Sequence, residues 1–281
     1  MNQKFGEVTI AVSLLVLLLI AVTVSTAQDA TTTNEQSQSE SDGTTHDHLW
    51  TKTTTIGQIV ADRPQTARVF ELVEIDYCCG GQVSLEDAAL EKRIKVNRLL
   101  AALSAVGSAT QETGRRNWQK ANIGELMDHI VARHHTWLRR ELPPLVETTK
   151  TVHRVHGRKH TELKKIADIV AKLPDAILPH LAYEEQTVFP AIKTLATGNP
   201  VKNIPRFLEE MRTDHDQIGE QLHELRKLTG DFLIPEDACA KYREMLTGLE
   251  ALERDLHIHV HLENNILLSR ALKLAESAND Q

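Results

Sequence analysis

Apolar residues recur every three or four positions along the C-terminal half of the chain. The pattern runs through four long segments, at about residues 123–155, 162–195, 204–228 and 235–275. Such spacing gathers the apolar side chains on one face of a helix, and helices of this length joined by short turns pack side by side. We therefore predict an up-down-up-down four-helix bundle over residues 120–275.

Local signals indicate where these helices begin and end. Asn122 is a good N-cap for the first, and turn-forming residues at 198–200 and 229–231 separate the later ones. Because proline lacks an N–H group and clashes with the preceding helical turn, we expect kinks or breaks wherever it falls inside a helix. The prolines concerned are Pro143, Pro144, Pro174 and Pro179.

A shorter helical region precedes the bundle, over residues 51–107. Ser84 followed by Asp87 has the form of a helix-capping pair, for a helix that runs to about residue 90, and residues 96–106 supply another helix. The motif Tyr77-Cys78-Cys79-Gly80-Gly81 lies between the apolar segments. We predict a small separate helical domain here, with residues 107–118 as the boundary loop.

The first 27 residues have the pattern of an export segment. Residues 8–24 are uncharged and mostly Val, Leu, Ile and Ala, Lys4 precedes them, and the small residues 25–27 follow. This predicts a signal peptide cleaved after Ala27, or an uncleaved membrane anchor, because the run is nearly long enough to span a bilayer. A buried core helix fits poorly, since no polar face interrupts the run. The chain is therefore expected to be exported, periplasmic or anchored to the cytoplasmic membrane.

Composition refines the picture of the remaining chain. Residues 28–50 are rich in Thr, Ser, Gln, Asn and acidic residues, which predicts a flexible linker. An apolar fraction of 41% can fill a core, and an aromatic fraction of only 4% favours helices over a β-sandwich or barrel. We predict an all-α fold. The net charge of −7 argues against nucleic acid as a partner.

Histidine and glutamate occupy core-facing positions on the four predicted helices. Each helix has one histidine on its apolar stripe, and the second and fourth helices add a glutamate one turn further on. A histidine nitrogen and a carboxylate oxygen one turn apart can bind one ion or two neighbouring ions. The six residues are His135, His180, Glu184, His215, His259 and Glu263.

Two carboxylates buried in such a core predict bound cations. No lysine or arginine lies on these stripes to neutralise Glu184 and Glu263, and an uncompensated buried charge is strongly unfavourable. Four histidines with two potentially bridging glutamates suit five- or six-coordinate iron better than tetrahedral zinc, while manganese is left open. His134, His257 and His261 lie off the stripes and are expected at the surface or beside the ligands.

With these residues identified, the chain resembles the iron–sulfur cluster repair di-iron proteins of the YtfE/ScdA type. The resemblance rests on the Tyr-Cys-Cys-Gly-Gly motif and on two segments, His180-Leu-Ala-Tyr-Glu184-Glu-Gln-Thr-Val-Phe-Pro190 and His259-Val-His-Leu-Glu263-Asn-Asn. It implies a hemerythrin-like bundle that holds two iron ions, with the glutamates as bridges. The ligands that the resemblance implies are again His135, His180, Glu184, His215, His259 and Glu263.

The resemblance also implies a function, the repair of iron–sulfur clusters damaged by nitric oxide or oxidants, by donation of iron. Two alternatives stay open: an exported hemerythrin-like binder or sensor of dioxygen or nitric oxide, and a di-iron nitric oxide reductase. Whether the chain is an enzyme is therefore undecided. Damaged iron–sulfur proteins, nitric oxide or dioxygen are the expected partners, and a homodimer is left open. An export segment would separate the chain from cytoplasmic clusters.

Three cysteines are too few for a disulfide framework. By resemblance, Cys78 and Cys79 belong to a domain whose cysteines contact a partner or a metal. Adjacent cysteines can also form a strained, reducible disulfide, or simply pack as thiols beside a glycine turn. Cys239 stands alone and is expected in the core.

Overall fold

The computed structural model describes residues 49–109 and 116–279. The predicted signal or anchor over residues 1–27, and the predicted linker as far as residue 48, lie outside this range. Over the described residues the regular elements are all helical, and the one β-contact is an isolated bridge between Thr55 and Ser84. The all-α prediction is confirmed for this part of the chain, which divides into two compact units after Arg115.

The first unit is a cluster of short helices. They are α2 (Ile56–Asp62), the 3₁₀ turn η1 (Pro64–Thr66), α3 (Ala67–Leu72), α4 (Leu85–Glu91) and α5 (Val96–Ala109). The hydroxyl oxygen of Ser84 caps α4 by accepting a hydrogen bond from the Asp87 N–H, as the sequence predicted. Phe70 and Leu85 are fully buried, so the short helices enclose a core of their own.

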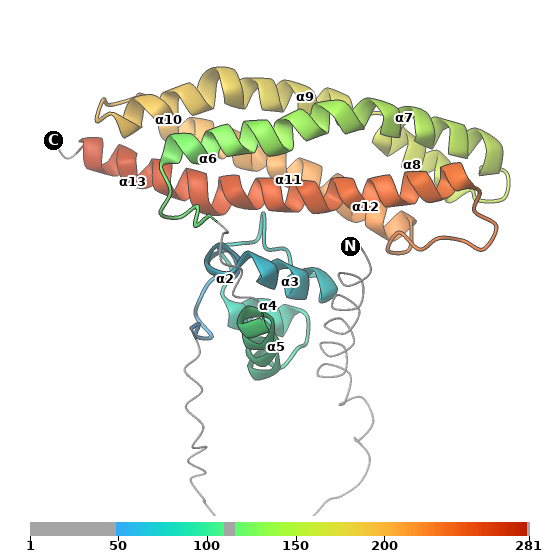
Figure 1. The fold of residues 1–281 in the computed structure, drawn as a ribbon, viewed down its shortest axis with the longest axis horizontal. Helices are drawn as coiled ribbons and strands as arrows, with labels where there is room; N and C mark the ends of the chain where they lie inside the picture. The colour runs from blue at the N-terminus through green and yellow to red at the C-terminus, as the bar shows by residue number, and fades with distance from the viewer. Residues whose placement is uncertain (1–48, 110–115, 280–281) are drawn as a thin grey trace, which may run out of the picture. The chain divides into compact units, whose positions relative to one another are not determined.

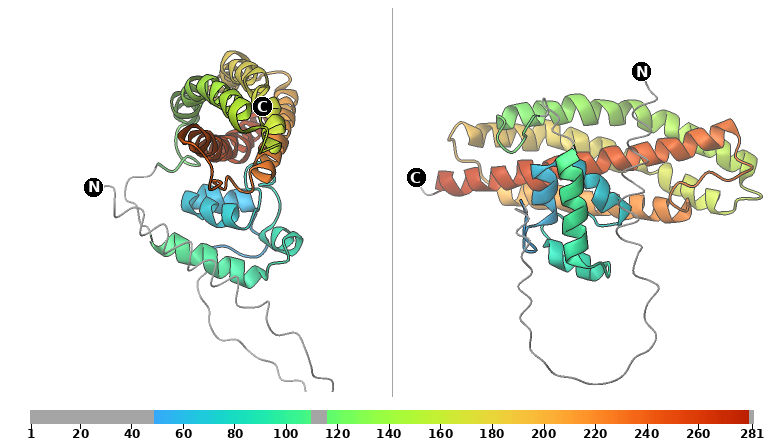
Figure 2. Two further views of the ribbon diagram at one scale, coloured as in Figure 1. Left: turned by 90° about the vertical axis from the view of Figure 1, so that its right-hand side faces the viewer. Right: turned by 60° about the horizontal axis from the view of Figure 1, so that its bottom comes forward.

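The helical segments of the second unit form four rods, each built from one or more segments, which lie side by side as a bundle (Figure 1). Rod 1 is α6 (Ile123–Ile130), η2 (Val131–His135) and α7 (Thr136–His156); rod 2 is α8 (Glu162–Val170), α9 (Leu173–Tyr183), η3 (Glu184–Val188) and α10 (Phe189–Ala196). Rod 3 is α11 (Ile204–Leu228), and rod 4 is α12 (Ala240–His261), η4 (Leu262–Leu267) and α13 (Leu268–Asn279). Seen along their length, the rods surround a common axis (Figure 2, left).

The rods follow the predicted apolar segments, with differences at their ends and prolines. Rod 4 begins at Ala240, later than the apolar pattern indicated. Rod 2 breaks beside Pro174, as expected, because α8 ends at Val170 and α9 begins at Leu173. Pro174 lies in the first turn of α9, where a missing N–H leaves no helical hydrogen bond unmade. Pro143 and Pro144 lie inside a continuous α7, and Pro179 inside α9, so the expected breaks do not occur there. Packing between the rods outweighs the local cost of these prolines.

A continuous cluster of buried, mostly aliphatic side chains fills the bundle on one side of the histidine and glutamate positions. Leu138, Leu249 and Leu256 belong to it and are almost completely buried. Burial of one such side chain contributes roughly 1.5–3 kcal/mol. Rods 1 and 4 approach closely, since a Cβ atom on Gly248 would lie 2.9 Å from Leu145 Cδ1. This packing holds the segments that carry the candidate ligands in register.

Candidate metal centre

The six candidate ligands come from all four rods and meet inside the bundle. His135 ends η2, His180 lies in α9, Glu184 begins η3, His215 lies in α11, His259 lies in α12, and Glu263 lies in η4. All six residues are buried, and both glutamates are fully enclosed. The structure therefore brings together every residue of the set that the helical stripes singled out.

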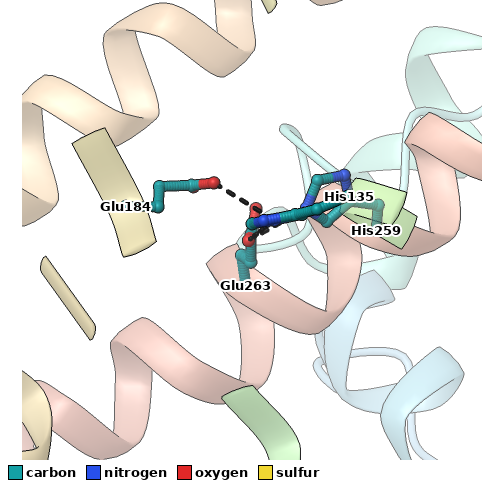
Figure 3. A group of neighbouring side chains, drawn as sticks. All are labelled: His135, Glu184, His259 and Glu263. Atoms are coloured by element: carbon teal, nitrogen blue, oxygen red, sulfur yellow. Dashed lines mark hydrogen bonds and ion pairs between the residues drawn. The ribbon is translucent and has the colours of Figure 1, made fainter. Parts of the chain in front are cut away.

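One half of the cluster, here called the 135/259 half, contains His135 and His259. Their Nε2 atoms are 3.1 Å apart, and His135 Nε2 lies 3.4 Å from Glu184 Oε2. Glu263 Oε1 lies 3.0 Å from His259 Nε2 and 3.8 Å from His135 Nε2. Glu184 approaches this half from the side opposite His135 and His259 (Figure 3).

The other half, here called the 180/215 half, contains His180 and His215. Their Nε2 atoms are 3.0 Å apart. Glu184 Oε1 lies 3.1 Å from His180 Nε2 and 3.7 Å from His215 Nε2, and Glu263 Oε2 lies 3.2 Å from His215 Nε2. Each glutamate therefore has one carboxylate oxygen in each half of the cluster.

Three of the four histidines place Nδ1 beside a side-chain acceptor. The contacts are His135 with Glu185 at 2.7 Å, His180 with Asp214 at 3.0 Å, and His215 with Asn264 at 2.9 Å. Carboxylate and amide oxygens only accept hydrogen bonds, so each of these Nδ1 atoms donates. In the neutral imidazole, Nε2 then carries a lone pair that points into the cluster, which is the form that binds a metal.

Sequence reasoning missed these three acceptors, although a signal was available. Glu185 and Asn264 directly follow Glu184 and Glu263, and Asp214 directly precedes His215. A chain neighbour lies about 100° around the helix from the ligand, so it faces an adjacent rod. A polar residue next to a core-facing ligand is thus a candidate to orient a histidine on another helix.

The charges in the cluster change the pKa values of its members. Burial alone would lower the pKa of His215, but the carboxylates of Glu184 and Glu263 raise it well above the usual histidine value. Burial alone would raise the pKa of Glu263, but His259, His135 and His215 hold it well below the usual carboxyl value. Burial and Glu263 would likewise raise the pKa of Glu184, but His180 and His215 hold it below the usual carboxyl value. Both glutamates are therefore ionised, and positive charge is strongly favoured between them.

The donor set fits metal ions. Both oxygens of Glu184 and Oε2 of Glu263 are buried and accept no well-formed hydrogen bond from any described residue. Two pairs of Nε2 atoms face each other at 3.0 and 3.1 Å, a separation at which two lone pairs repel unless a proton or cation lies near them. Buried carboxylates without partners are costly by several kcal/mol each. Cations bound by these atoms would satisfy all of them at once.

Rods 1, 2 and 4 change from α-helical to π-helical geometry at the cluster. The segments η2, η3 and η4 are π-helical, and each contains one candidate ligand, namely His135, Glu184 or Glu263. A π-helical turn holds one more residue than an α-helical turn, and such turns occur often at functional sites. The extra residue shifts the helix face, so a candidate ligand and the apolar residues that follow it both face the core. Period-3.6 reasoning did not predict these segments.

Two histidines outside the candidate set are more enclosed than expected. His134 is 3% exposed and His261 is 4% exposed, so the surface alternative is wrong for both. His134 Nδ1 lies 3.1 Å from Asp255 Oδ2, and its ring lies nearly parallel to that of His259, with centroids 5.3 Å apart and an interplanar angle of 6°. His134 is thus a neighbour of the cluster.

Cys78 and Cys79 lie in the first unit, and neither forms a disulfide with a described cysteine. Asp76 Oδ1 accepts hydrogen bonds from both of their backbone N–H groups at 2.9 Å, and the Cys78 thiol lies 3.1 Å from the same oxygen. A Cβ on Gly80 would lie 2.7 Å from the Asp76 carbonyl oxygen, which explains a glycine in the motif. Cys79 and burial raise the pKa of the Cys78 thiol well above its usual value. Their redox or partner role stays a prediction.

Cys239 does not lie in the core, and that prediction is wrong. It is exposed and stands at the N-terminal end of α12, where its sulfur lies 3.2 Å from His156 Nε2. Because rod 4 begins later than its apolar pattern indicates, Cys239 falls in the connection that precedes the helix instead of inside it. Burial tendency alone could not reveal this.

Comparison with known families defines the class of protein. Residues 126–271 match the family described as the hemerythrin HHE cation binding domain, and residues 52–107 match the family named ScdA_N, described as a domain of unknown function (DUF542). The second unit is thus a hemerythrin-type cation-binding bundle.

Relatives identify the family more closely. The iron-sulfur cluster repair protein ScdA of Staphylococcus epidermidis is 33% identical over 221 residues, which cover 78% of this chain and 98% of the relative. The iron-sulfur cluster repair protein YtfE of Enterobacter sp. is 33% identical over 217 residues, which cover 77% of this chain and 96% of the relative. The YtfE protein of Yersinia pseudotuberculosis is 33% identical over 222 residues, which cover 79% of this chain and 98% of the relative. The chain belongs to the iron–sulfur cluster repair family.

These findings correct the predicted localisation. The expectation of an exported, periplasmic or membrane-anchored protein relied on the hydropathy of residues 1–27 alone, whereas the relatives that match most of the chain are named for iron–sulfur cluster repair. Within the two described ranges, no helix is both long and apolar enough to cross a bilayer. The correction follows from the family to which the chain belongs, and residues 1–27 themselves lie outside the described ranges.

Proposed function

We propose that the six clustered residues bind two iron ions and that the chain repairs iron–sulfur clusters by supplying iron. The observation that supports this most directly is the position of the two enclosed glutamates, because Glu184 and Glu263 each have one oxygen in each half of the cluster. A carboxylate in this position can bridge two ions and compensate their charge. The names of the relatives supply the link to cluster repair.

The composition of the donor set supports two ions and favours iron. Each half offers two imidazole nitrogens and one oxygen from each glutamate. Such a half can serve an ion that prefers five or six donors and leave room for an exchangeable ligand. A structural zinc ion would instead favour a closed tetrahedron, often with cysteine. No cysteine among the described residues belongs to the cluster.

The protein's own residues perform separate tasks in this proposal. The four Nε2 atoms bind, and the acceptors beside three Nδ1 atoms fix the ring orientation and the tautomer. Burial of both glutamates excludes water from their oxygens. The bound iron would serve both as the material that a rebuilt cluster needs and as a centre able to react with nitric oxide or dioxygen.

We further propose that the targets are clusters damaged by nitric oxide or oxidants. Such damage removes iron from a cluster whose protein still offers thiolate ligands. Thiolates select iron–sulfur clusters, whereas the donors here are imidazole and carboxylate. Transfer is therefore expected to run from this chain to the damaged protein.

Metal analysis and a repair assay together test the proposal. Iron-loaded protein should contain two iron ions per chain, and its Mössbauer spectrum should show a coupled pair. Incubation with a cluster enzyme inactivated by nitric oxide should restore more activity than the same amount of free ferrous iron. Protein that retains almost no iron would contradict the metal centre. Recovery no greater than with free iron would contradict the repair function.

A further inference from the structure

The two halves of the cluster are supported unequally. In the 180/215 half, both histidines have an acceptor beside Nδ1, which is Asp214 for His180 and Asn264 for His215. In the 135/259 half, only His135 has one. The Nδ1 atom of His259 is buried and has no hydrogen-bond partner among residues 49–109 and 116–279.

The missing acceptor matters because it leaves the His259 ring with one restraint fewer. A hydrogen bond from the second ring nitrogen fixes the orientation and tautomer of a metal-binding histidine and makes the binding nitrogen more basic. Loss of such a partner typically lowers metal affinity by about 10- to 100-fold. The 135/259 half lacks this support at one of its two histidines.

A buried pair, His134 and Asp255, takes the place of that acceptor. The His134 ring lies nearly parallel to the His259 ring, with centroids 5.3 Å apart. His134 Nδ1 lies 3.1 Å from Asp255 Oδ2, within ion-pair distance but without a well-formed hydrogen bond. The other carboxylate oxygen of Asp255, Oδ1, lies 3.6 Å from the Arg133 guanidinium, which also favours the ionised carboxylate at this place. The residues His134 and Asp255 are 3% and 7% exposed, yet neither contributes a ligand atom to the cluster. Stacking restrains the plane of the His259 ring but does not polarise it.

We propose that the metal held in the 135/259 half is the exchangeable one, and that His134, which stacks on His259 and faces Asp255, is a positioning residue that sets its rate of release. The proposal builds on the proposed binding of two ions and adds which one leaves first. His134 and Asp255 are buried polar residues that contribute no ligand atom to the cluster and do not belong to the apolar core, and the proposal gives them a function. A repair protein that supplies iron needs such a difference, since one retained ion keeps the bundle assembled while the other is transferred.

Release kinetics test the proposal directly. Protein loaded anaerobically with ferrous ion is mixed with excess of a colorimetric ferrous chelator, and we expect two phases of one ion each, differing by about tenfold in rate. Crystals of protein stopped after the first phase should show anomalous scattering at the iron edge between His180 and His215. A single phase for both ions, or residual iron between His135 and His259, would overturn the assignment.

Two matched variants separate the roles of the two halves. His134→Phe keeps an aromatic ring over His259 but removes the contact with Asp255, and it should accelerate only the fast phase by about tenfold. Asp214→Asn removes the carboxylate beside His180 and should accelerate only the slow phase. Thermal midpoints recorded on both proteins report any general loss of stability. Equal acceleration of both phases by His134→Phe, or an unchanged fast phase, would show that His134 does not position His259.

The outcomes also separate this inference from the proposed function. Wild-type protein that binds fewer than two ions contradicts the di-iron centre itself. Two ions released in one phase contradict only the inequality of the halves. Two release phases together with a failed repair assay would support the difference between the two halves and contradict the repair function.

Discussion

At the scale of single residues, the imidazoles of the cluster take their chemical form from the groups that surround them. A carboxylate or amide oxygen beside Nδ1 directs the Nε2 lone pair of His135, His180 and His215 inward. Burial would lower the pKa of His180, but Glu184 raises it above the usual value. In the metal-free protein, protons and metal ions therefore compete for the same nitrogen atoms.

Replacement of His180 tests this cluster most simply. His180→Ala removes one Nε2 donor and leaves Glu184 Oε1 without its nearest partner, so bound iron should fall from two ions per chain to about one or fewer. Elemental analysis of the purified protein measures the change. His223→Ala, an exposed position in α11, is the matched control and should retain all the iron. Full iron occupancy in His180→Ala would contradict the ligand set.

The pKa shifts also predict how metal affinity depends on pH. The folded, metal-free protein holds a proton on His215 to a higher pH than an ordinary histidine does, because the two glutamates raise its pKa. That proton must leave before Nε2 can bind, so affinity should weaken as pH falls, by about tenfold per pH unit for each proton displaced. Competition titrations between about pH 8 and about pH 6 measure the slope. A pH-independent affinity would contradict the proton competition.

At the scale of elements, the π-helical segments change the angle at which successive residues leave the helix. A candidate ligand and the apolar residues that follow it can therefore both face the core. In η3, the Phe189 N–H donates to the Glu184 carbonyl, five residues back, instead of four. Residues on both sides of the segment can then face the core. Regular α-helical geometry would rotate one of these faces away.

Deletion of Gln186 should convert the π-helical turn of η3 into an ordinary α-helical turn. Gln186 is exposed within η3, so its removal takes away the extra residue without removing a core side chain. Either Glu184 or the apolar residues from Val188 onward must then turn by about 100°. We expect bound iron to fall below one ion per chain and the thermal midpoint to drop. Gln186→Ala should change neither quantity, and a deletion variant with two iron ions would argue against a role for the π-helical turn.

The partly buried ion pair between Arg226 in α11 and Glu253 in α12 provides a stability prediction at the same scale. The Arg226 guanidinium donates to both carboxylate oxygens of Glu253, which is 4% exposed. Arg226→Met leaves that carboxylate unpaired and should lower the free energy of unfolding by about 1–3 kcal/mol, as measured by urea denaturation. The exposed pair of Arg254 and Glu250 is the control, because Arg254→Met should cost less than about 1 kcal/mol.

At the scale of the whole molecule, the division into two units separates the cysteine motif from the candidate metal centre. Cys78 and Cys79 belong to the first unit, and all six cluster residues belong to the second. Each unit has its own buried core, with Phe70 in the first and Leu249 in the second. Units with separate cores are expected to unfold separately.

Iron removal should therefore affect one unit only. A ligand stabilises the folded state to which it binds, so calorimetry of the full chain should show two transitions, and chelation should lower only the one that belongs to residues 116–281. Residues 116–281 produced alone should bind the same amount of iron as the full chain. A single transition that moves as a whole on chelation would contradict independent units.

Much of the cluster could be predicted from the sequence because the relevant geometry is local. Residues four apart share a helix face, so His180 with Glu184 and His259 with Glu263 had to project together, and their apolar neighbours indicated that this face is the inner one. The helical segments were predictable for the same reason. The choice of iron came from resemblance, since manganese suits the same donors.

Only the tertiary structure decided the features that depend on contacts between rods. The sequence by itself determined an all-α chain and the six residues on inward stripes. It could not show that Asp214 orients His180 from another helix, that His259 Nδ1 has no such partner, or that His134 is buried against it. Helix periodicity acts over a few residues, whereas these contacts join residues many positions apart and are determined by how the rods pack.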